Sequence, residues 1–192
     1  MITRTPIASL FLAIAMAAGI AHAEPATYAI DPTHTFVTFE AKHFGTSTNR
    51  GRFDKKSGTV TIDAAAKTGK VDISIYMSSI NSGTEAFNNH LKSKDFFNAE
   101  AFPKATFVSD KVIFEGDKVS AVVGTLTLLG KSQTVTLKAN NYNCYQNPML
   151  KREVCGGDFD TTITRSEYGM GYGLPFIPDN VHLLIQVEAV KQ

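Results

Sequence analysis

The sequence predicts an all-β domain with one short helical insert, built either as an antiparallel barrel of about eight strands or as a two-sheet sandwich. Three observations support this prediction. Apolar and polar residues alternate with a period of two over most of the chain, as in half-buried strands. Turn residues separate these short segments. Only residues 78–107 show helical spacing. A sandwich and a closed barrel share this pattern, so periodicity leaves both open.

Residues 1–23 have the composition of a cleaved secretory signal peptide. Arg4 precedes an uncharged run over residues 7–21, and Ala21-His22-Ala23 fits an A-x-A cleavage site. The run is shorter than the roughly 20 residues that span a bilayer, and no Cys follows the site to carry a lipid anchor. We expect cleavage after Ala23, export to a bacterial periplasm or secretion, and one mature domain of residues 24–192.

The strands are expected wherever the alternation is regular. Its clearest instance is residues 71–77, where every second residue is apolar. The segment Glu115-Gly116-Asp117 is a tight-turn signal that joins two of the strands into a hairpin. In chain order, the expected strands are 35–43, 51–53 continuing in 58–63, 71–77, 106–114, 118–129, 134–145, 159–165 and 181–189. Each has one apolar face and one polar face, so each buries one side.

The helical stretch begins with residues that favour a helix start. Ser82 stands three residues before Glu85, which is the spacing of a capping box. Phe87 and Leu91 are four residues apart and share one helix face. Phe96-Phe97 follows the helix and adds apolar bulk. We expect either a lid or plug on the sheet, or a plain connecting helix that fills a hole in the core.

Composition favours a neutral surface around an apolar interior. Residues 24–192 carry 18 basic and 18 acidic residues, because Arg4 is the only charged residue before them. This balance argues against a nucleic-acid partner, which calls for a basic patch. The same residues hold twelve Phe and no Trp. Phe has no polar group to satisfy, so it can line a dry cavity or fill a core.

Cys144 and Cys155 are the only cysteines. In an oxidising compartment, two cysteines that flank a short loop favour a disulfide, and Asn147-Pro148 is a turn signal within that loop. Closing so short a loop would stabilise the fold by about 3 kcal/mol. A redox pair and a pair of zinc ligands are the alternatives, although the spacing is not C-x-x-C.

The sequence carries no catalytic signature. It contains no G-x-S-x-G elbow, H-E-x-x-H helix, phosphate loop or dinucleotide fingerprint, and no pair of acids stands out as general acid and base. His34, His43, His90 and His182 lack the spacing of metal ligands. We expect these histidines to bond to backbone at strand ends and in loops.

A ligand pocket needs a few polar groups in an apolar wall. Asn89, His90 and Arg165 are the candidates for these groups, and Arg165 ends an otherwise apolar strand face. For Arg165 the alternative role is a salt bridge to Asp95 or Glu167.

Over nearly all of residues 24–192, the chain resembles the YceI-like family. The segments that carry the resemblance are Tyr28-Ala-Ile-Asp31-Pro-Thr-His34-Thr-Phe-Val37-Thr-Phe39, His43-Phe-Gly45, Arg50-Gly51-Arg52-Phe53, His90-Leu91-Lys-Ser-Lys-Asp95-Phe96-Phe97, Phe102-Pro103, Phe107, Gly124-Thr-Leu126-Thr-Leu128 and Thr164-Arg165-Ser166-Glu-Tyr168-Gly169. Two positions depart from the family pattern. Leu128-Leu129-Gly130 stands where the family reads L-T-x-H-G, and Asn89 stands where it tends to have an acid. The cysteine loop resembles an insertion.

The resemblance implies a lipocalin-like, eight-stranded antiparallel barrel with an elongated apolar cavity. It implies periplasmic binding, transport or storage of a long-chain isoprenoid lipid, such as a ubiquinone-like quinone or a polyprenyl compound. We expect a homodimer, transient membrane contact, and no catalytic activity, metal or cofactor beyond the bound lipid. The residues expected to bind the ligand are Val37, Phe39, Phe53, Val71, Ile73, Ile75, Met77, Asn89, His90, Leu91, Phe96, Phe97, Phe107, Leu126, Leu128, Ile163 and Arg165.

Two other functions stay open at this point. One is a metal-assisted enzyme that acts on a lipid-like substrate through His34, His43 or His90. The other is a ligand-free interaction module, for which the barrel is only a stable scaffold.

Overall fold

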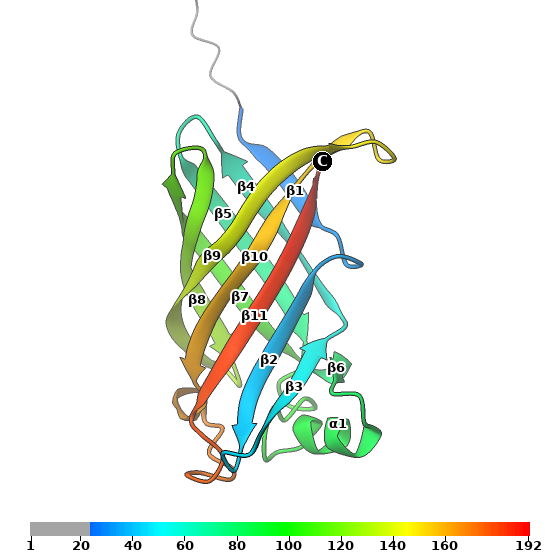
Figure 1. Ribbon diagram of the computed structural model, residues 1–192, viewed down its shortest axis with the longest axis vertical. Coiled ribbons are helices and arrows are strands. Elements are labelled where there is room, and N and C mark those ends of the chain that lie inside the picture. The colour runs from blue at the N-terminus through cyan, green and yellow to red at the C-terminus, as the bar shows by residue number, and fades with distance from the viewer. Residues whose placement is uncertain (1–23) are drawn as a thin grey trace, which may run out of the picture.

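The computed structural model describes residues 24–192. The expected signal peptide and its cleavage site lie in residues 1–23, outside the described residues. The described chain folds into a tall antiparallel barrel with one α-helix at its lower end (Figure 1). None of its helices is long and apolar enough to cross a membrane.

Eight strands close the barrel. In ring order, they are β1 (Ala26–Ile30), β4 (Lys56–Asp63), β5 (Thr68–Tyr76), β7 (Lys104–Glu115), β8 (Lys118–Leu128), β9 (Lys131–Asn147), β10 (Arg152–Thr164) and β11 (Asn180–Lys191). The ring closes where β1 pairs with β11, from Tyr28 opposite Lys191 to Ile30 opposite Ala189. The predicted barrel is therefore confirmed over the sandwich, because the eight strands form one closed ring and not two separate sheets.

Two wall strands are interrupted partway along the barrel. β2 (Phe36–His43) pairs with the first half of β11, and β1 pairs with its last residues, so β1 and β2 share one edge of β11. β3 (Ser47–Phe53) likewise pairs with β2, while β4 pairs with β1. Strand β6 (Ile80–Asn81) extends the sheet beyond β3. The short strands β1 and β6 were not among those expected.

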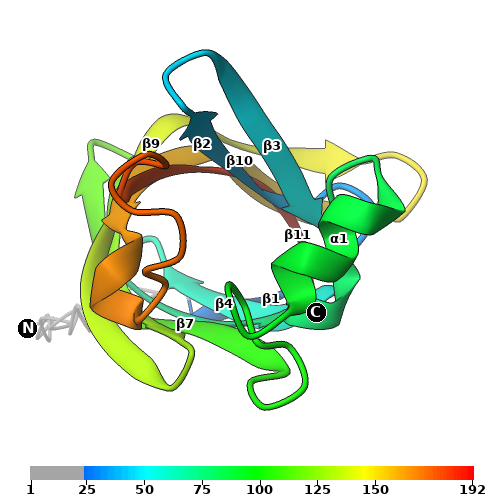
Figure 2. The ribbon, with the colours of Figure 1, turned by 90° about the horizontal axis from the view of Figure 1, so that it is seen from below.

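The helical insert lies between β5 and β7 of the barrel wall. After β5 come the 3-10 helix η1 (Met77–Ser79), β6 and then α1 (Glu85–Lys92), before β7 resumes the wall. Seen from below, α1 lies across one side of the barrel opening (Figure 2). The second 3-10 helix, η2 (Arg165–Tyr168), begins the loops on the other side. The insert thus covers the lower end of the barrel.

The predicted capping box is wrong. The helix N-cap is Thr84, whose side chain makes no capping hydrogen bond. Ser82 lies two residues earlier, and its hydroxyl donates to Asn88 Oδ1 at 2.7 Å, as does its backbone N–H at 2.7 Å. The Ser82–Asn88 tie therefore orients the first turn in place of a capping box.

The predicted hairpins and disulfide are both present. Gly116 adopts a φ of +60° in the turn that joins Glu115 to Lys118, which is a backbone conformation that favours glycine. At the opposite end of the barrel from α1, Cys144 and Cys155 face each other across β9 and β10 and form a disulfide. The bond links the two strands of the longest hairpin.

Candidate functional site: an apolar cavity along the barrel

The interior of the barrel holds two connected cavities. The wider one, of about 750 Å³, lies at the lower end beside α1. The narrower one, of about 140 Å³, lies deeper. Their walls share Val37, Ile75, Leu126 and Leu183, so they follow one another along the barrel. Sites for small molecules usually measure about 300–1,000 Å³, and the wider cavity falls within that range.

The period-two alternation of the strands produces the apolar wall. Neighbouring residues of a strand point to opposite faces, so every second residue faces the interior. On β11 the inward set is Val181, Leu183, Ile185, Val187 and Ala189, as the sequence predicted. The intervening residues, such as His182 and Leu184, face outward. Apolar side chains supply most of the inward positions, so the wall of the cavity is largely apolar.

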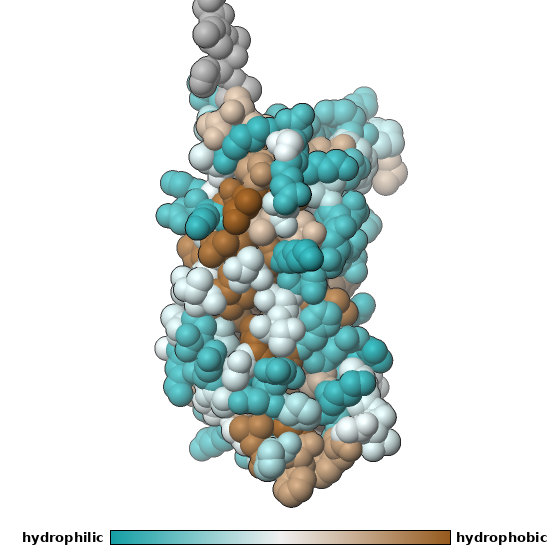
Figure 3. Space-filling model, turned by 60° about the vertical axis from the view of Figure 1, so that its left-hand side comes forward, coloured by the Kyte–Doolittle hydropathy of each residue, from teal (hydrophilic) through white to brown (hydrophobic). Residues whose placement is uncertain are grey.

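The two parts of the cavity differ in how exposed their lining residues are. Every residue that lines the narrow part is buried or half-buried. The wide part, in contrast, is lined in part by strongly exposed side chains, including Phe44 at 58% exposure and Phe176 at 67%. Figure 3 shows apolar surface at this lower tip of the molecule. A ligand would therefore enter beside α1 and extend toward the disulfide end.

Sixteen of the seventeen residues expected to bind a ligand line the cavity. Those in the wide part are Val37, Phe39, Phe53, Ile75, Met77, His90, Leu91, Phe96, Phe97, Leu126, Leu128, Ile163 and Arg165. Those found only in the narrow part are Val71, Ile73 and Phe107. Asn89 is the exception. It is exposed on α1 and lines neither part, so the expectation that it supplies a polar group to the cavity is corrected.

Two glycines make room for the phenylalanines of the wall. A Cβ at Gly51 would lie 2.6 Å from Phe39 Cε1, its cross-strand neighbour. A Cβ at Gly124 would lie 2.6 Å from Phe107 Cζ. Each ring therefore lies against bare backbone on the adjoining strand. A larger residue at either position would drive the ring toward the cavity and narrow it.

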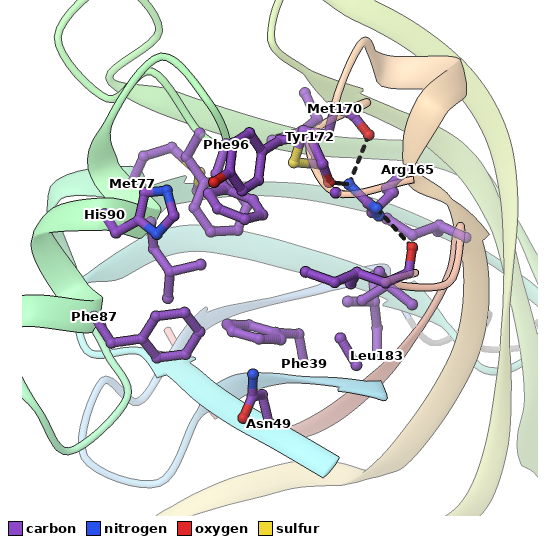
Figure 4. Close-up of a pocket in the computed structure, with 18 of the residues that line it drawn as sticks. Phe39, Asn49, Met77, Phe87, His90, Phe96, Arg165, Met170, Tyr172 and Leu183 are labelled. Atoms are coloured by element: carbon purple, nitrogen blue, oxygen red, sulfur yellow. Dashed lines mark hydrogen bonds between the residues drawn. The ribbon is translucent and has the colours of Figure 1, made fainter. Parts of the chain in front are cut away.

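The helical insert forms one wall of the wide cavity. Phe97 packs edge-on against Phe53, with ring centroids 5.3 Å apart, and against Phe39 at 6.4 Å. From α1 itself, Phe87 and Leu91 line the same space. Figure 4 shows Phe87 pointing from α1 toward Phe39. The insert is therefore a cover over the cavity, which favours the lid or plug over a plain connecting helix.

His90 marks the polar side of the entrance. Its Nε2 lies 3.1 Å from Asp95 Oδ2, and its ring packs edge-on against Phe96 and Tyr172. Asn49 and Thr84 line the same part of the cavity and were not singled out from the sequence. Asn49 lies on β3 and Thr84 is the helix N-cap, and no periodic signal in the sequence distinguishes them.

The outward histidines pair with carboxylates, and the expectation that they bond to backbone is corrected. His34 Nδ1 lies 2.7 Å from Asp31 Oδ2. His182 lies between Asp160, at 3.1 Å, and Glu40, at 3.5 Å. The hydrogen bond to Asp160 and the one to Glu40 raise the pKa of His182 against the effect of burial. Within the described residues, no three His, Cys, Asp or Glu side chains gather as metal ligands.

Arg165 does not serve as a free polar group. Only 3% of it is exposed, and it lies at the cavity wall. Its Nη1 donates to the carbonyls of Met170 and Tyr172, both at 2.9 Å (Figure 4). Its Nη2 donates to Ile177 O at 2.9 Å and its Nε to Pro178 O at 3.0 Å. These bonds fix the loop of residues 169–178 at the entrance.

The alternative role of Arg165, a salt bridge, is also corrected. Among the ion pairs of residues 24–192, none joins it to Asp95 or Glu167. Burial lowers the pKa of the guanidinium, while the nearby Asp179 opposes that shift. The guanidinium nevertheless stays charged, and its N–H groups donate to four backbone carbonyls.

Lys56 is a wall residue that sequence reasoning missed. It is 5% exposed and lines the narrow cavity from β4. Its ammonium lies 4.1 Å from the centroid of the Phe36 ring and 3.4 Å from Asp54 O. Burial lowers its pKa. Lys56 is an even number of residues from Val60 and Ile62 on β4, so it lies on the same face of the strand as they do. This spacing is the one sequence signal that it faces inward.

Known proteins share this architecture. Residues 28–189 match the model of the YceI-like domain. The UPF0312 protein of Shewanella denitrificans is 34% identical over 170 residues, which cover 87% of this chain and 88% of that one. The crystal structure of BcnA from Burkholderia cenocepacia has a TM-score of 0.69 at 28% identity, covering 83% of this chain and 99% of that one.

A more distant structure shares the fold. It is a polyisoprenoid binding domain from Saccharophagus degradans implicated in plant cell wall breakdown, with a TM-score of 0.60 at 16% identity. The likeness covers 86% of this chain and 98% of that domain, and at this identity it shows the fold alone. The family match over residues 28–189 is the stronger finding. This chain belongs to the YceI-like family.

Proposed function

We propose that this protein binds a long-chain isoprenoid lipid, such as an isoprenoid quinone or a polyprenyl compound, and transports or stores it in the periplasm. The observation that carries the proposal is the apolar interior of the barrel, where a wide cavity beside α1 is followed by a narrower one with buried and half-buried walls. A long apolar tail suits the narrow part. A bulkier head group suits the entrance, where Asn49, Thr84 and His90 supply polar atoms.

The free energy of such binding comes from covering the tail. Each CH₂ group removed from water contributes about 0.8 kcal/mol. A carrier must therefore enclose most of the tail, and a shallow surface groove would leave much of it in water. The branched side chains on β5, β8 and β11 supply that enclosure, because their inward rows run the length of the barrel.

The relatives support the proposal. The structure from Saccharophagus degradans is described as a polyisoprenoid binding domain, and this chain has the same fold with a cavity in its interior. The leader composition of residues 1–23 supports export. The family resemblance also implies a homodimer, which sedimentation of the purified protein would test.

The direct test is to identify what the protein carries. Protein purified from its native envelope is extracted with organic solvent, and the extract is analysed by mass spectrometry. We expect a long-chain isoprenoid in near-equal amount to the protein. An extract with no lipid, from protein that also fails to take up an added isoprenoid quinone, would contradict the proposal.

An enzyme that acts on such a lipid is the second candidate. It is favoured by the His90–Asp95 pair, whose atoms lie 3.1 Å apart beside the entrance. Metal analysis of the purified protein and turnover of a bound isoprenoid by the His90→Ala variant test it. Turnover that disappears in this variant, with lipid binding retained, would favour the enzyme over the carrier.

A further inference from the structure

One loop at the entrance is uncharged and exposes several large side chains. Residues 169–178 read GMGYGLPFIP and contain no charged side chain. Tyr172 is 48% exposed, Leu174 36% and Phe176 67%. Phe44, on the loop after β2, is 58% exposed and stacks on Phe176 with ring centroids 5.9 Å apart. We refer to residues 169–178 together with Phe44 as the mouth tip. Exposed apolar groups gathered in this way mark an interaction site.

Part of the backbone of the mouth tip is satisfied from within. Arg165 donates to the carbonyls of Met170, Tyr172, Ile177 and Pro178. The backbone N–H groups of Met170, Leu174 and Ile177 donate to carbonyls of residues 165, 171 and 173. The prolines at 175 and 178 have no N–H to satisfy. A loop that enters an apolar medium needs such internal pairing, because an unpaired peptide group there is costly.

The mouth tip is also continuous with the cavity. Phe44, Tyr172 and Phe176 are at once exposed to solvent and part of the wall of the wide cavity. If the outer side of the tip is in contact with lipid, a ligand that passes these residues moves directly from one apolar environment to another. Otherwise each CH₂ must cross water at a cost of about 0.8 kcal/mol.

We propose that the mouth tip inserts into the interfacial region of a lipid bilayer, so that the cavity opens onto the membrane. The choice of a bilayer rests on the proposed function, because an isoprenoid lipid resides there. A protein partner fits less well, since a stable protein interface takes roughly 20–30 residues a side and the mouth tip offers only a few side chains.

The sequence contains no tryptophan, which permits a clean fluorescence test. Phe176→Trp places a single reporter in the mouth tip. Met149→Trp, at the disulfide-linked hairpin on the opposite end of the barrel, is the matched control, since Met149 is apolar and 87% exposed (Figure 1). With phosphatidylethanolamine–phosphatidylglycerol vesicles, we expect the emission of Phe176→Trp to shift to shorter wavelength and to be quenched by brominated acyl chains. The emission of Met149→Trp should not change.

A second pair of variants measures the contribution of the apolar tip. Leu174 belongs to the tip but does not line the cavity. Leu174→Glu should weaken vesicle binding by about tenfold or more, because a carboxylate disfavours the bilayer. Leu150→Glu, in the opposite hairpin, should leave vesicle binding unchanged. Circular dichroism and uptake of isoprenoid quinone from detergent check that Leu174→Glu is folded and loads normally.

The outcomes separate this proposal from the function on which it rests. Vesicle insertion of the Phe176→Trp reporter by a protein that carries no lipid would support docking and contradict the carrier. Lipid uptake without any vesicle-induced shift would contradict docking and leave the carrier standing. An equal response from both tryptophan variants would overturn docking at this end. A blue shift that grows with protein concentration in the absence of vesicles would overturn it in favour of a second copy of the chain.

Discussion

The narrow inner cavity can be blocked by one substitution. Ile73 lies on β5, between Gly58 on β4 and Phe107 on β7, and lines only the narrow part. In Ile73→Trp the larger side chain would extend into a space of about 140 Å³. Overpacking usually costs about 1–3 kcal/mol of stability. We expect the lower end of that range, because the indole enters a cavity and not a packed core.

The expected effect on binding follows from the volume that is lost. A space of about 140 Å³ holds about four groups the size of a water molecule or a methylene, at roughly 30 Å³ each. At about 0.8 kcal/mol for each excluded CH₂, the loss is about 3 kcal/mol. This corresponds to a Kd roughly 200-fold higher.

The assay is a titration of purified, delipidated protein with an isoprenoid quinone, followed by native mass spectrometry or calorimetry. Val108→Trp is the matched control, because Val108 is on the neighbouring strand but is 50% exposed. We expect it to bind as the unmodified protein does. If Ile73→Trp also binds normally while remaining folded, the tail does not reach the narrow cavity and the reasoning fails.

Three further predictions concern the framework around the cavity. Replacing both Cys144 and Cys155 by Ser should lower the free energy of unfolding in urea by about 3 kcal/mol, and an unchanged value would show that the hairpin holds without the bond. Arg165→Met should lower the free energy of unfolding by about 2–4 kcal/mol, because the loop carbonyls lose their donor. Amide hydrogen exchange should then become faster in residues 169–178. Arg165→Lys should restore only part of the lost stability, since lysine lacks the planar guanidinium. Burial acts to raise the pKa of Asp31, but hydrogen bonds from His34 and Thr33 outweigh it and lower that pKa to about 2. A carboxyl whose folded pKa is lowered stabilises the fold above its unfolded pKa, so Asp31 should contribute a fall in stability of at most about 2 kcal/mol between about pH 4 and pH 2. In Asp31→Asn, urea unfolding should show a fall over this range that is smaller by that contribution.

The inward faces of the strands could be predicted from the sequence because a strand has a period of two. A shift by one residue would expose the whole apolar row, so the burial of one face fixes which residues point inward. The row on β11 and the row of Val71, Ile73 and Ile75 on β5 were recognisable for this reason. Barrel closure was not, because it depends on pairing between β1 and β11 at opposite ends of the chain.

The polar residues were harder to place. Asn89 lies two residues from both Phe87 and Leu91, and positions two apart on a helix do not share a face. Helical geometry alone therefore argues against Asn89 in the wall. Arg165 could not be assigned from the sequence, since its four acceptors come together only when residues 169–178 fold around it. Lys56 was not predicted to line the cavity, because a charged residue in a strand usually indicates a position on the protein surface.

The proposed function requires that the apolar tail of the ligand occupies the length of the barrel. The decisive measurement is the Kd for a series of isoprenoid quinones that share one head group and differ only in the number of isoprene units. We expect the affinity to rise with each added unit while the tail fills the cavity and then to level off, at a shorter length in Ile73→Trp. A Kd that does not depend on tail length would contradict the account, because binding would then reside in the head group alone.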